Sequence, residues 1–381
     1  MIAAAVITSE TFTPEILVFF SAPASGRRSS ASPRLPGPRL SLMRFGLALP
    51  HYDTSLAGRP YEWDSLKRVA RLAETSGFDS VWISDHLFLD WGKYGGPDEP
   101  QGTPECLMTM SALAGVTERV KIGSLALCND FRNPALLAKM ISTIDRLSDG
   151  RLDVGMGAGW YEPEYAAAGI EFLPPGDRIR RLGESLQIMS RLLEGEVVDF
   201  DGEHYHLKGA LCRPSPKQQP RPALWVGGKG DFLLRTAVRH ADGWNYSWIG
   251  DFDAYRERAG RANQICEAEG RDPASFRRSV GIYLLAGDDR SDMERRFERL
   301  AKRTPPGILQ ASNSETGVSW DEFRKSNLVG TPDEVAQKLE ELAELGVEEV
   351  VFTLGSIPFQ LGDEEDVAYV GESIIPALDG R

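Results

Sequence analysis

The sequence is poor in positive charge and contains no long apolar run. Its 381 residues include 43 lysines and arginines against 56 aspartates and glutamates, which gives a formal net charge of −13. An acidic chain is a poor match for nucleic-acid phosphates or anionic membranes, because both attract basic surfaces. No apolar run approaches the roughly 20 residues that span a bilayer. We therefore expect a small-molecule partner and neither a nucleic-acid nor a membrane partner.

Cysteine is also scarce, and its spacing carries no metal signature. Cys106, Cys128, Cys212 and Cys266 are scattered, and no pair has the C-x-x-C spacing of a zinc or redox site. Such cysteines are typical of free, mostly buried thiols in a reducing compartment. Other metal-ligand spacings and the G-x-S-x-G nucleophile motif are also lacking. The sequence predicts a cytoplasmic protein without a metal site and disfavours hydrolase chemistry.

The first 42 residues differ in composition from the rest. The stretch 21–42 is rich in Ser, Pro, Ala and Arg and has no usable periodicity. A segment of this composition cannot bury a core, which predicts disorder. Folding is then expected to begin at Met43, which would also serve as an alternative start. We expect a disordered extension over 1–42 and a single catalytic domain over 43–381.

From Arg44 onward, apolar strands alternate with helical patterns. Most strands are continuously apolar, as buried parallel strands are. Eight βα units favour an α/β fold, a (β/α)8 TIM barrel with insertions, over an open eight-stranded sheet. A hairpin signal at 197–207 interrupts the rhythm, and the aperiodic stretch 304–327 is long enough to be a lid or binding loop. The expected strands are 45–50, 80–84, 120–127, 151–156, 223–226, 243–246, 278–286 and 348–354.

Histidines at strand ends are the first candidates for chemistry, because a barrel gathers its active site at the carboxyl ends of its strands. His86 follows Asp85 at the end of the second strand. An imidazole there can transfer a proton near neutral pH, although it can also simply hold its loop. His51 occupies a similar place after the first strand, with weaker support. His204 and His206 share one face of the expected hairpin and lack a third ligand, so an exposed hairpin is the better interpretation.

Two glycine-rich turns could bring backbone close to a flat or phosphorylated ligand. Gly157, Ala158 and Gly159 end the fourth strand, and Trp160 adds a ring surface beside them. The turn Gly227–Gly230 precedes a helix, whose first N–H groups can bind phosphate with help from Lys229. A tight turn without a ligand is the alternative for the second motif. Position alone suggests that Trp248 and residues 304–327 shape specificity.

Four segments together resemble the luciferase-like family of flavin and deazaflavin oxidoreductases. They are FGLALP at 45–50, GFDSVWISDH at 77–86, the stretch 121–165 with GMGAGWYEPEY at its end, and WVGGKG to ADGWN within 225–245. The resemblance covers nearly all of 44–381 and is closest to the branch that uses coenzyme F420. It implies a TIM barrel with an isoalloxazine-type ring at its mouth.

The resemblance also assigns roles to particular residues. It implies that Asp85 and His86 are catalytic, with His86 assisting hydride transfer as a proton donor or anion stabiliser. It implies a non-prolyl cis peptide behind the ring, for which Ser124–Leu125 is the candidate. Five cations could meet the polyanionic tail of F420: Arg132, Lys139, Arg178, Arg180 and Lys229. The expected cofactor-binding residues are Asp85, Ser124, Leu125, Asn129, Gly157, Ala158, Gly159, Trp160, Gly227, Gly228, Lys229 and Gly230.

These observations predict an F420-dependent oxidoreductase that transfers a hydride between the deazaflavin and a small organic substrate. The alternative is an FMNH2-dependent monooxygenase on the same fold, in which reduced flavin activates O2. A third hypothesis is a non-catalytic cofactor carrier on a degenerate barrel. A homodimer is the expectation from the family.

Overall fold

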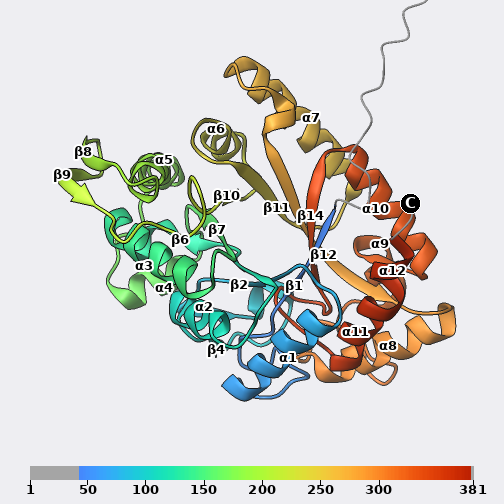
Figure 1. The fold of residues 1–381 in the computed structure, drawn as a ribbon. Coiled ribbons are helices and arrows are strands. Elements are labelled where there is room, and N and C mark those ends of the chain that lie inside the picture. The colour runs from blue at the N-terminus through green and yellow to red at the C-terminus, as the bar shows by residue number, and fades with distance from the viewer. Residues whose placement is uncertain (1–42, 379–381) are drawn as a thin grey trace, which may run out of the picture. The chain divides into compact units, whose positions relative to one another are not determined.

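Eight short apolar strands close into a parallel barrel at the centre of the protein (Figure 1). The computed structural model describes residues 43–378. The barrel strands are β1 (Arg44–Ala48), β2 (Ser80–Ile83), β5 (Lys121–Ser124), β7 (Leu152–Gly157), β10 (Leu224–Gly227), β11 (Gly243–Ile249), β12 (Arg277–Ala286) and β14 (Val347–Thr353). Each pairs in parallel with its neighbours in this order, β7 pairs with β10, and β14 returns to β1. The predicted TIM barrel is confirmed, and the open sheet is excluded.

Amphipathic helices surround the barrel and bury their apolar faces against it. In the first of them, Leu66, Val69, Ala70 and Ala73 are buried at helical spacing. None of the helices in residues 43–378 combines the length and apolarity needed to cross a bilayer. The outer helices are α1 (Trp63–Thr75), α2 (Cys106–Ala114), α3 (Pro134–Leu147), α5 (Pro175–Leu193), α6 (Asp231–His240), α7 (Phe252–Ala268), α8 (Arg290–Arg303) and α10 (Pro332–Glu344).

A buried charged layer ties five strands together at the amino-terminal end of the barrel. The carboxylates of Glu349 on β14 and Asp153 on β7 are both fully buried. Arg44 on β1 lies 2.6 Å from Glu349 and 3.4 Å from Asp153, and Lys121 on β5 lies 3.2 Å from Asp153. Ser80 on β2 donates a 2.6 Å hydrogen bond to Glu349. This layer lies at the opposite end of the barrel from the carboxyl tips, where chemistry is expected.

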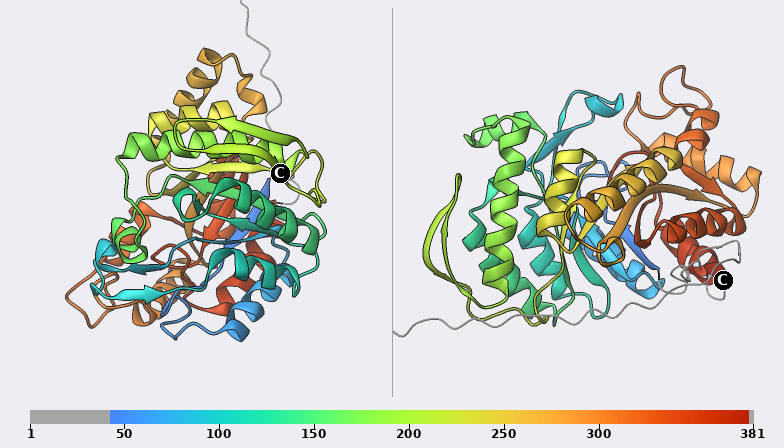
Figure 2. Two further views of the ribbon diagram at one scale, coloured as in Figure 1. Left: turned by 90° about the vertical axis from the view of Figure 1, so that its left-hand side faces the viewer. Right: turned by 90° about the horizontal axis from the view of Figure 1, so that it is seen from above.

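Several elements are inserted between the βα units of the barrel. The expected hairpin is confirmed as β8 (Val197–Asp201) and β9 (His206–Leu211), and it lies outside α5, away from the barrel (Figure 2). Further elements were not expected from the sequence: the hairpin β3 (Phe88–Asp90) and β4 (Pro100–Gly102), β6 (Leu127–Cys128), α4 (Glu162–Ala168), α9 (Trp320–Ser326) and β13 (Leu328–Gly330). The last three elements follow one another without a gap: α11 (Glu364–Tyr369), a π-helix (Val370–Ile374) and α12 (Ile375–Leu378).

Two expectations about the termini and loops have different outcomes. The expected disordered extension over 1–42 lies outside the described residues. The stretch 304–327 is not a structureless loop, because it contains α9, which begins with a capping box between Ser319 and Glu322. None of the residues 304–327 lines the cavity described below.

Candidate active site

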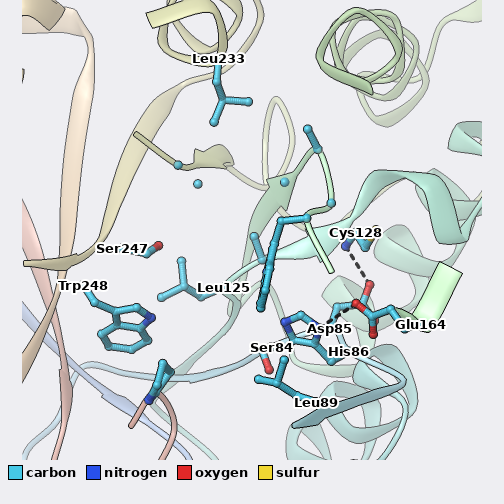
Figure 3. Close-up of a pocket in the computed structure, with 18 of the residues that line it drawn as sticks. Ser84, Asp85, His86, Leu89, Leu125, Cys128, Glu164, Leu233, Ser247 and Trp248 are labelled. Atoms are coloured by element: carbon cyan, nitrogen blue, oxygen red, sulfur yellow. Dashed lines mark hydrogen bonds and ion pairs between the residues drawn. The ribbon is translucent and has the colours of Figure 1, made fainter. Parts of the chain in front are cut away.

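A cavity of about 400 Å³ opens at the carboxyl ends of the barrel strands (Figure 3). Its lining comes from β11, from segments that follow β1, β2, β5, β7 and β10, and from the loop after β14. His86 and Glu164 lie on one side of it, with Leu125 and Trp248 across from them. Of the expected cofactor-binding residues, nine line it: Asp85, Leu125, Gly157, Ala158, Gly159, Trp160, Gly227, Gly228 and Gly230.

One side of the cavity is built from backbone and very small side chains. The peptide bond Leu125–Ala126 is cis, so the prediction of a cis bond at Ser124–Leu125 is wrong by one residue. The reason is that Ser124 still belongs to β5, where its hydroxyl donates to the Gly155 carbonyl at 2.9 Å. A Cβ added to Gly157 or Gly227 would lie 3.6 or 3.5 Å from the Ala126 methyl group. These small residues form one low surface, which leaves room for a flat ligand.

Asp85 lines the cavity, but its carboxylate is fully engaged. It is 4% exposed, and its two oxygens accept hydrogen bonds from Arg132 at 2.6 and 2.9 Å. One oxygen also accepts from the Cys128 N–H at 2.9 Å. Burial disfavours the Arg132 cation, but hydrogen bonds to Asp85 and Glu105 outweigh it and raise the pKa of Arg132. The geometry therefore gives Asp85 an anchoring role between the ends of β2 and β6.

His86 is held by a carboxylate that the sequence did not single out. Its Nδ1 lies 2.8 Å from Oε1 of Glu164, on α4, and the other oxygen of Glu164 accepts the Leu87 N–H at 2.8 Å. Glu164 is only 2% exposed. Because the carboxylate accepts, Nδ1 carries a proton, and in the neutral form of the ring Nε2 is an acceptor. Nε2 has no hydrogen-bond partner among the described residues, so it is free for a ligand.

A second histidine lies behind the cavity in a buried chain of hydrogen bonds. Nδ1 of His51 lies 2.7 Å from the Leu49 carbonyl oxygen, and Nε2 lies 2.9 Å from the Ser84 hydroxyl. The Ser84 hydroxyl also contacts the hydroxyl of Tyr52, and both residues line the cavity. Burial lowers the pKa of His51 to about 4, so the ring is neutral at physiological pH. The sequence did not identify Tyr52 or Ser84, because hydroxyl side chains near strand ends are common.

An aromatic pair forms the wall opposite His86. Trp248 and Phe359 meet edge to face with ring centroids 5.5 Å apart, and both have positive φ, at 36° and 58°. Large side chains rarely adopt this backbone conformation, so the fold holds both residues against local strain. A Cβ at Gly281 would lie 2.8 Å from the Trp248 ring, so a glycine is needed beneath it. The expectation that Trp248 lies at the pocket agrees with this position.

The remaining expected residues lie outside the cavity lining. Ser124 is buried in β5. The Asn129 amide, also buried, donates to Asp130 and to the Tyr205 hydroxyl. Lys229 donates to the Trp248 carbonyl at 3.1 Å and lies 4.5 Å from the Tyr246 ring centroid.

Of the five cations expected to meet an anionic tail, Arg178 alone is part of the lining. Its guanidinium lies 3.9 Å from the Phe172 ring centroid. Arg132 is paired with two carboxylates, Lys139 donates to the Arg213 carbonyl and Arg180 contacts Asp177. The geometry therefore leaves most of this cationic set already engaged within the protein.

Metal-ligating side chains do not gather at the site. Within residues 43–378, the structure contains no group of three or more His, Cys, Asp or Glu side chains arranged to hold a metal ion. His206 pairs with Asp201 at 2.7 Å on the exposed hairpin. The cavity instead brings the His86 imidazole close to a surface of small residues.

Comparison with known proteins places this geometry in a family. Residues 43–349 match the luciferase-like monooxygenase family, and the chain belongs to it. An F420-dependent glucose-6-phosphate dehydrogenase from Gordonia bronchialis is 31% identical over 300 residues, covering 75% of this chain and 86% of the relative. An FMNH2-dependent dimethylsulfone monooxygenase from Pseudomonas putida is 24% identical over 339 residues, covering 84% and 88%. The family thus includes both F420-dependent dehydrogenases and FMNH2-dependent monooxygenases.

Solved structures agree with the fold. The coenzyme F420-dependent tetrahydromethanopterin reductase from Methanopyrus kandleri superposes with a TM-score of 0.66 at 20% identity, over 88% of this chain and 99% of the other. At that identity, the likeness supports the barrel architecture alone. The chain therefore belongs to an oxidoreductase family, and its barrel has a cavity at the carboxyl ends of the strands.

Proposed function

We propose that this protein is an F420-dependent oxidoreductase that transfers a hydride between the deazaflavin and a small organic substrate. The observation that carries the proposal is the His86–Glu164 pair beside the small-residue surface. Hydride transfer to or from an alcohol or carbonyl carbon needs a group that accepts or returns one proton. Nε2 of His86 is free to do this, because Glu164 binds the opposite ring nitrogen.

The described residues fit the cofactor in two respects. Ala126, Gly157 and Gly227 leave a surface on which a planar ring can lie without meeting side chains. Gly228 and Gly230 line the cavity at the start of α6, where the first N–H groups of the helix have no intrahelical partner. When bound there, F420 would supply the carbon that carries the hydride.

The protein contributes orientation and proton chemistry. The Asp85–Arg132 pair fixes the strand end that carries His86. Glu164 stabilises a proton on Nδ1 and the positive charge that appears when Nε2 takes up a second proton. In the oxidative direction Nε2 accepts the hydroxyl proton of the substrate, and in the reductive direction the imidazolium returns it. Trp248 and Phe359 cover the opposite wall and exclude water from the substrate side.

A cofactor titration tests this proposal directly. We expect F420 to bind the purified protein with a change in its fluorescence, and FMN to compete poorly. The variant His86→Gln should still bind F420 and lose single-turnover hydride transfer by about 10²- to 10⁴-fold. Retention of FMN together with no response to F420 would refute the proposal.

An FMNH2-dependent monooxygenase is the second candidate. The Pseudomonas putida relative spans 84% of this chain, and the wall formed by Trp248 and Phe359 would shield a reduced flavin from water. Oxygen consumption with enzymatically reduced FMN, coupled to oxidation of a substrate, would favour this candidate over the first.

A further inference from the structure

The hydrogen-bond chain behind the cavity has only one self-consistent direction. A carbonyl oxygen can only accept, so the 2.7 Å contact with Leu49 requires the proton on Nδ1 of His51. The ring is neutral, so Nε2 is an acceptor. It accepts from the Ser84 N–H at 3.2 Å and from the Ser84 hydroxyl at 2.9 Å. The Ser84 hydroxyl proton is therefore committed to His51.

The direction of the Ser84–His51 hydrogen bond also determines the direction of the hydrogen bond between Tyr52 and Ser84. Because the Ser84 hydroxyl donates its hydrogen bond to His51, its oxygen must accept from the hydroxyl of Tyr52. Ser84 is the only hydrogen-bond partner of that hydroxyl within the described part of the chain. Tyr52 is 2% exposed and lines the cavity. The proton of the Tyr52 hydroxyl points toward Ser84. The phenolic oxygen can therefore only accept a hydrogen bond from a ligand.

The cavity therefore has two hydrogen-bond acceptors in its lining, one on His86 and one on Tyr52. Nε2 of His86 accepts when the ring is neutral, and the phenolic oxygen of Tyr52 accepts in every state of the chain. The two rings have centroids 6.4 Å apart, so one small molecule can contact both. A ligand with a single donor would leave one buried acceptor unsatisfied, which is unfavourable.

We propose that the substrate carries a second hydrogen-bond donor, a hydroxyl or amine group, next to the reacting group, and that Tyr52 recognises it through the ordered chain Tyr52–Ser84–His51. The role of His86 in this proposal rests on the proposed function. The direction of the hydrogen-bond chain Tyr52–Ser84–His51 does not depend on which cofactor binds. Tyr52 is a specificity-determining residue, and Ser84 and His51 are positioning residues that act through it.

The direction of the chain is tested first by ¹⁵N NMR on protein labelled at its five histidines. His51, assigned by its loss in His51→Gln, should show a protonated Nδ1 and an unprotonated Nε2 from pH 8 to about pH 5. Ser84→Ala should shift the Nε2 resonance, because the hydroxyl donor is gone. A protonated Nε2 at neutral pH would overturn the proposal.

Substrate preference is tested by calorimetric binding of a matched pair of probes to the protein with the cofactor it retains. In the monomethyl ether of cyclohexane-1,2-diol a methyl group replaces the second donor proton. Wild type should prefer the diol by about tenfold, and Tyr52→Phe should reduce the preference to about twofold or less. Ser84→Ala frees the phenol proton to turn toward the cavity, so its preference should move toward the ether.

Tyr161→Phe is the matched control, since this tyrosine hydroxyl contacts Asp90 and does not line the cavity. It should keep the wild-type preference. Equal binding of the two probes by wild type, an unchanged preference in Tyr52→Phe, or no binding of either probe would each overturn the proposal. Failure of the proposed function would appear differently, as no F420 binding alongside an intact probe preference.

Discussion

Acid should destabilise this protein at a higher pH than its carboxylates alone would dictate, and His51 should be the main cause. The ring is 1% exposed, and burial lowers its pKa from 6.5 to about 4. Between these two pH values His51 is protonated in the unfolded chain and neutral in the folded chain. Stability therefore rises with pH in this window and is lost as pH falls from about 6.5 toward 4. The full change corresponds to about 3 kcal/mol for this one residue.

Most other groups can be separated from His51 by the pH window or by the sign of their effect on stability. Hydrogen bonds and nearby cations outweigh burial and lower the pKa of Asp292 and Asp363, so these residues lose their contribution only below about pH 4.5. Burial raises the pKa of Glu349, which acts with the opposite sign. Burial also lowers the pKa of His240, which adds to the effect of His51 in the same window.

The assay is urea unfolding of wild type and His51→Gln at half-unit steps from pH 4.5 to pH 8. The difference between the two stability curves should shrink by about 3 kcal/mol as pH falls, because glutamine does not titrate. The exposed His206 provides a control, and His206→Gln should follow the wild-type curve. Parallel curves for wild type and His51→Gln would refute the reasoning.

Three further predictions concern the cavity. Glu164→Gln should lower kcat by about tenfold to a hundredfold with little change in KM, measured by steady-state kinetics, because the charge that stabilises the proton relay is lost. Gly159→Ala should cost about 3 kcal/mol or more in urea unfolding, because φ is +75° and the new Cβ would lie 1.7 Å from the Tyr165 hydroxyl; Gly169→Ala, with φ of +68° and nothing within 4 Å, should cost about 1 kcal/mol. Trp248→Ala should raise kcat/KM for bulky substrates relative to small ones, and an unchanged ratio would exclude Trp248 from the substrate wall.

The barrel could be predicted from the sequence because buried parallel strands have a distinct pattern. Continuous apolar runs such as 80–84 alternate with amphipathic helices such as 62–76, and eight such units favour a closed sheet. The ends of these elements were less predictable. The strand expected at 120–127 divides into β5 and β6, because the chain turns at Leu125–Ala126, and no residue type marks a cis bond between two non-proline residues.

The site could be predicted only where a strand end carries an unusual residue. His86 lies shortly after β2 and Gly157 ends β7, so topology alone brings them to the cavity. Glu164 could not be found in this way, because it reaches His86 from a short helix 78 positions along the chain. Proximity to a glycine turn suggested that Lys229 binds a ligand, and the structure adds that its side chain donates to the Trp248 carbonyl.

The charged layer at the base of the barrel has a consequence for how the protein can change. Arg44, Lys121 and Glu349 bind strands to one another at the end of the barrel opposite the cavity, so these contacts do not depend on the loops that line the cavity. Loops at the carboxyl ends of the strands can be replaced by others that form new pockets, while the charged layer keeps the strands aligned. Residues that stabilise the barrel and residues that line the cavity thus lie at opposite ends of the same strands. Substrate specificity can therefore be changed by substitution without a loss of fold stability.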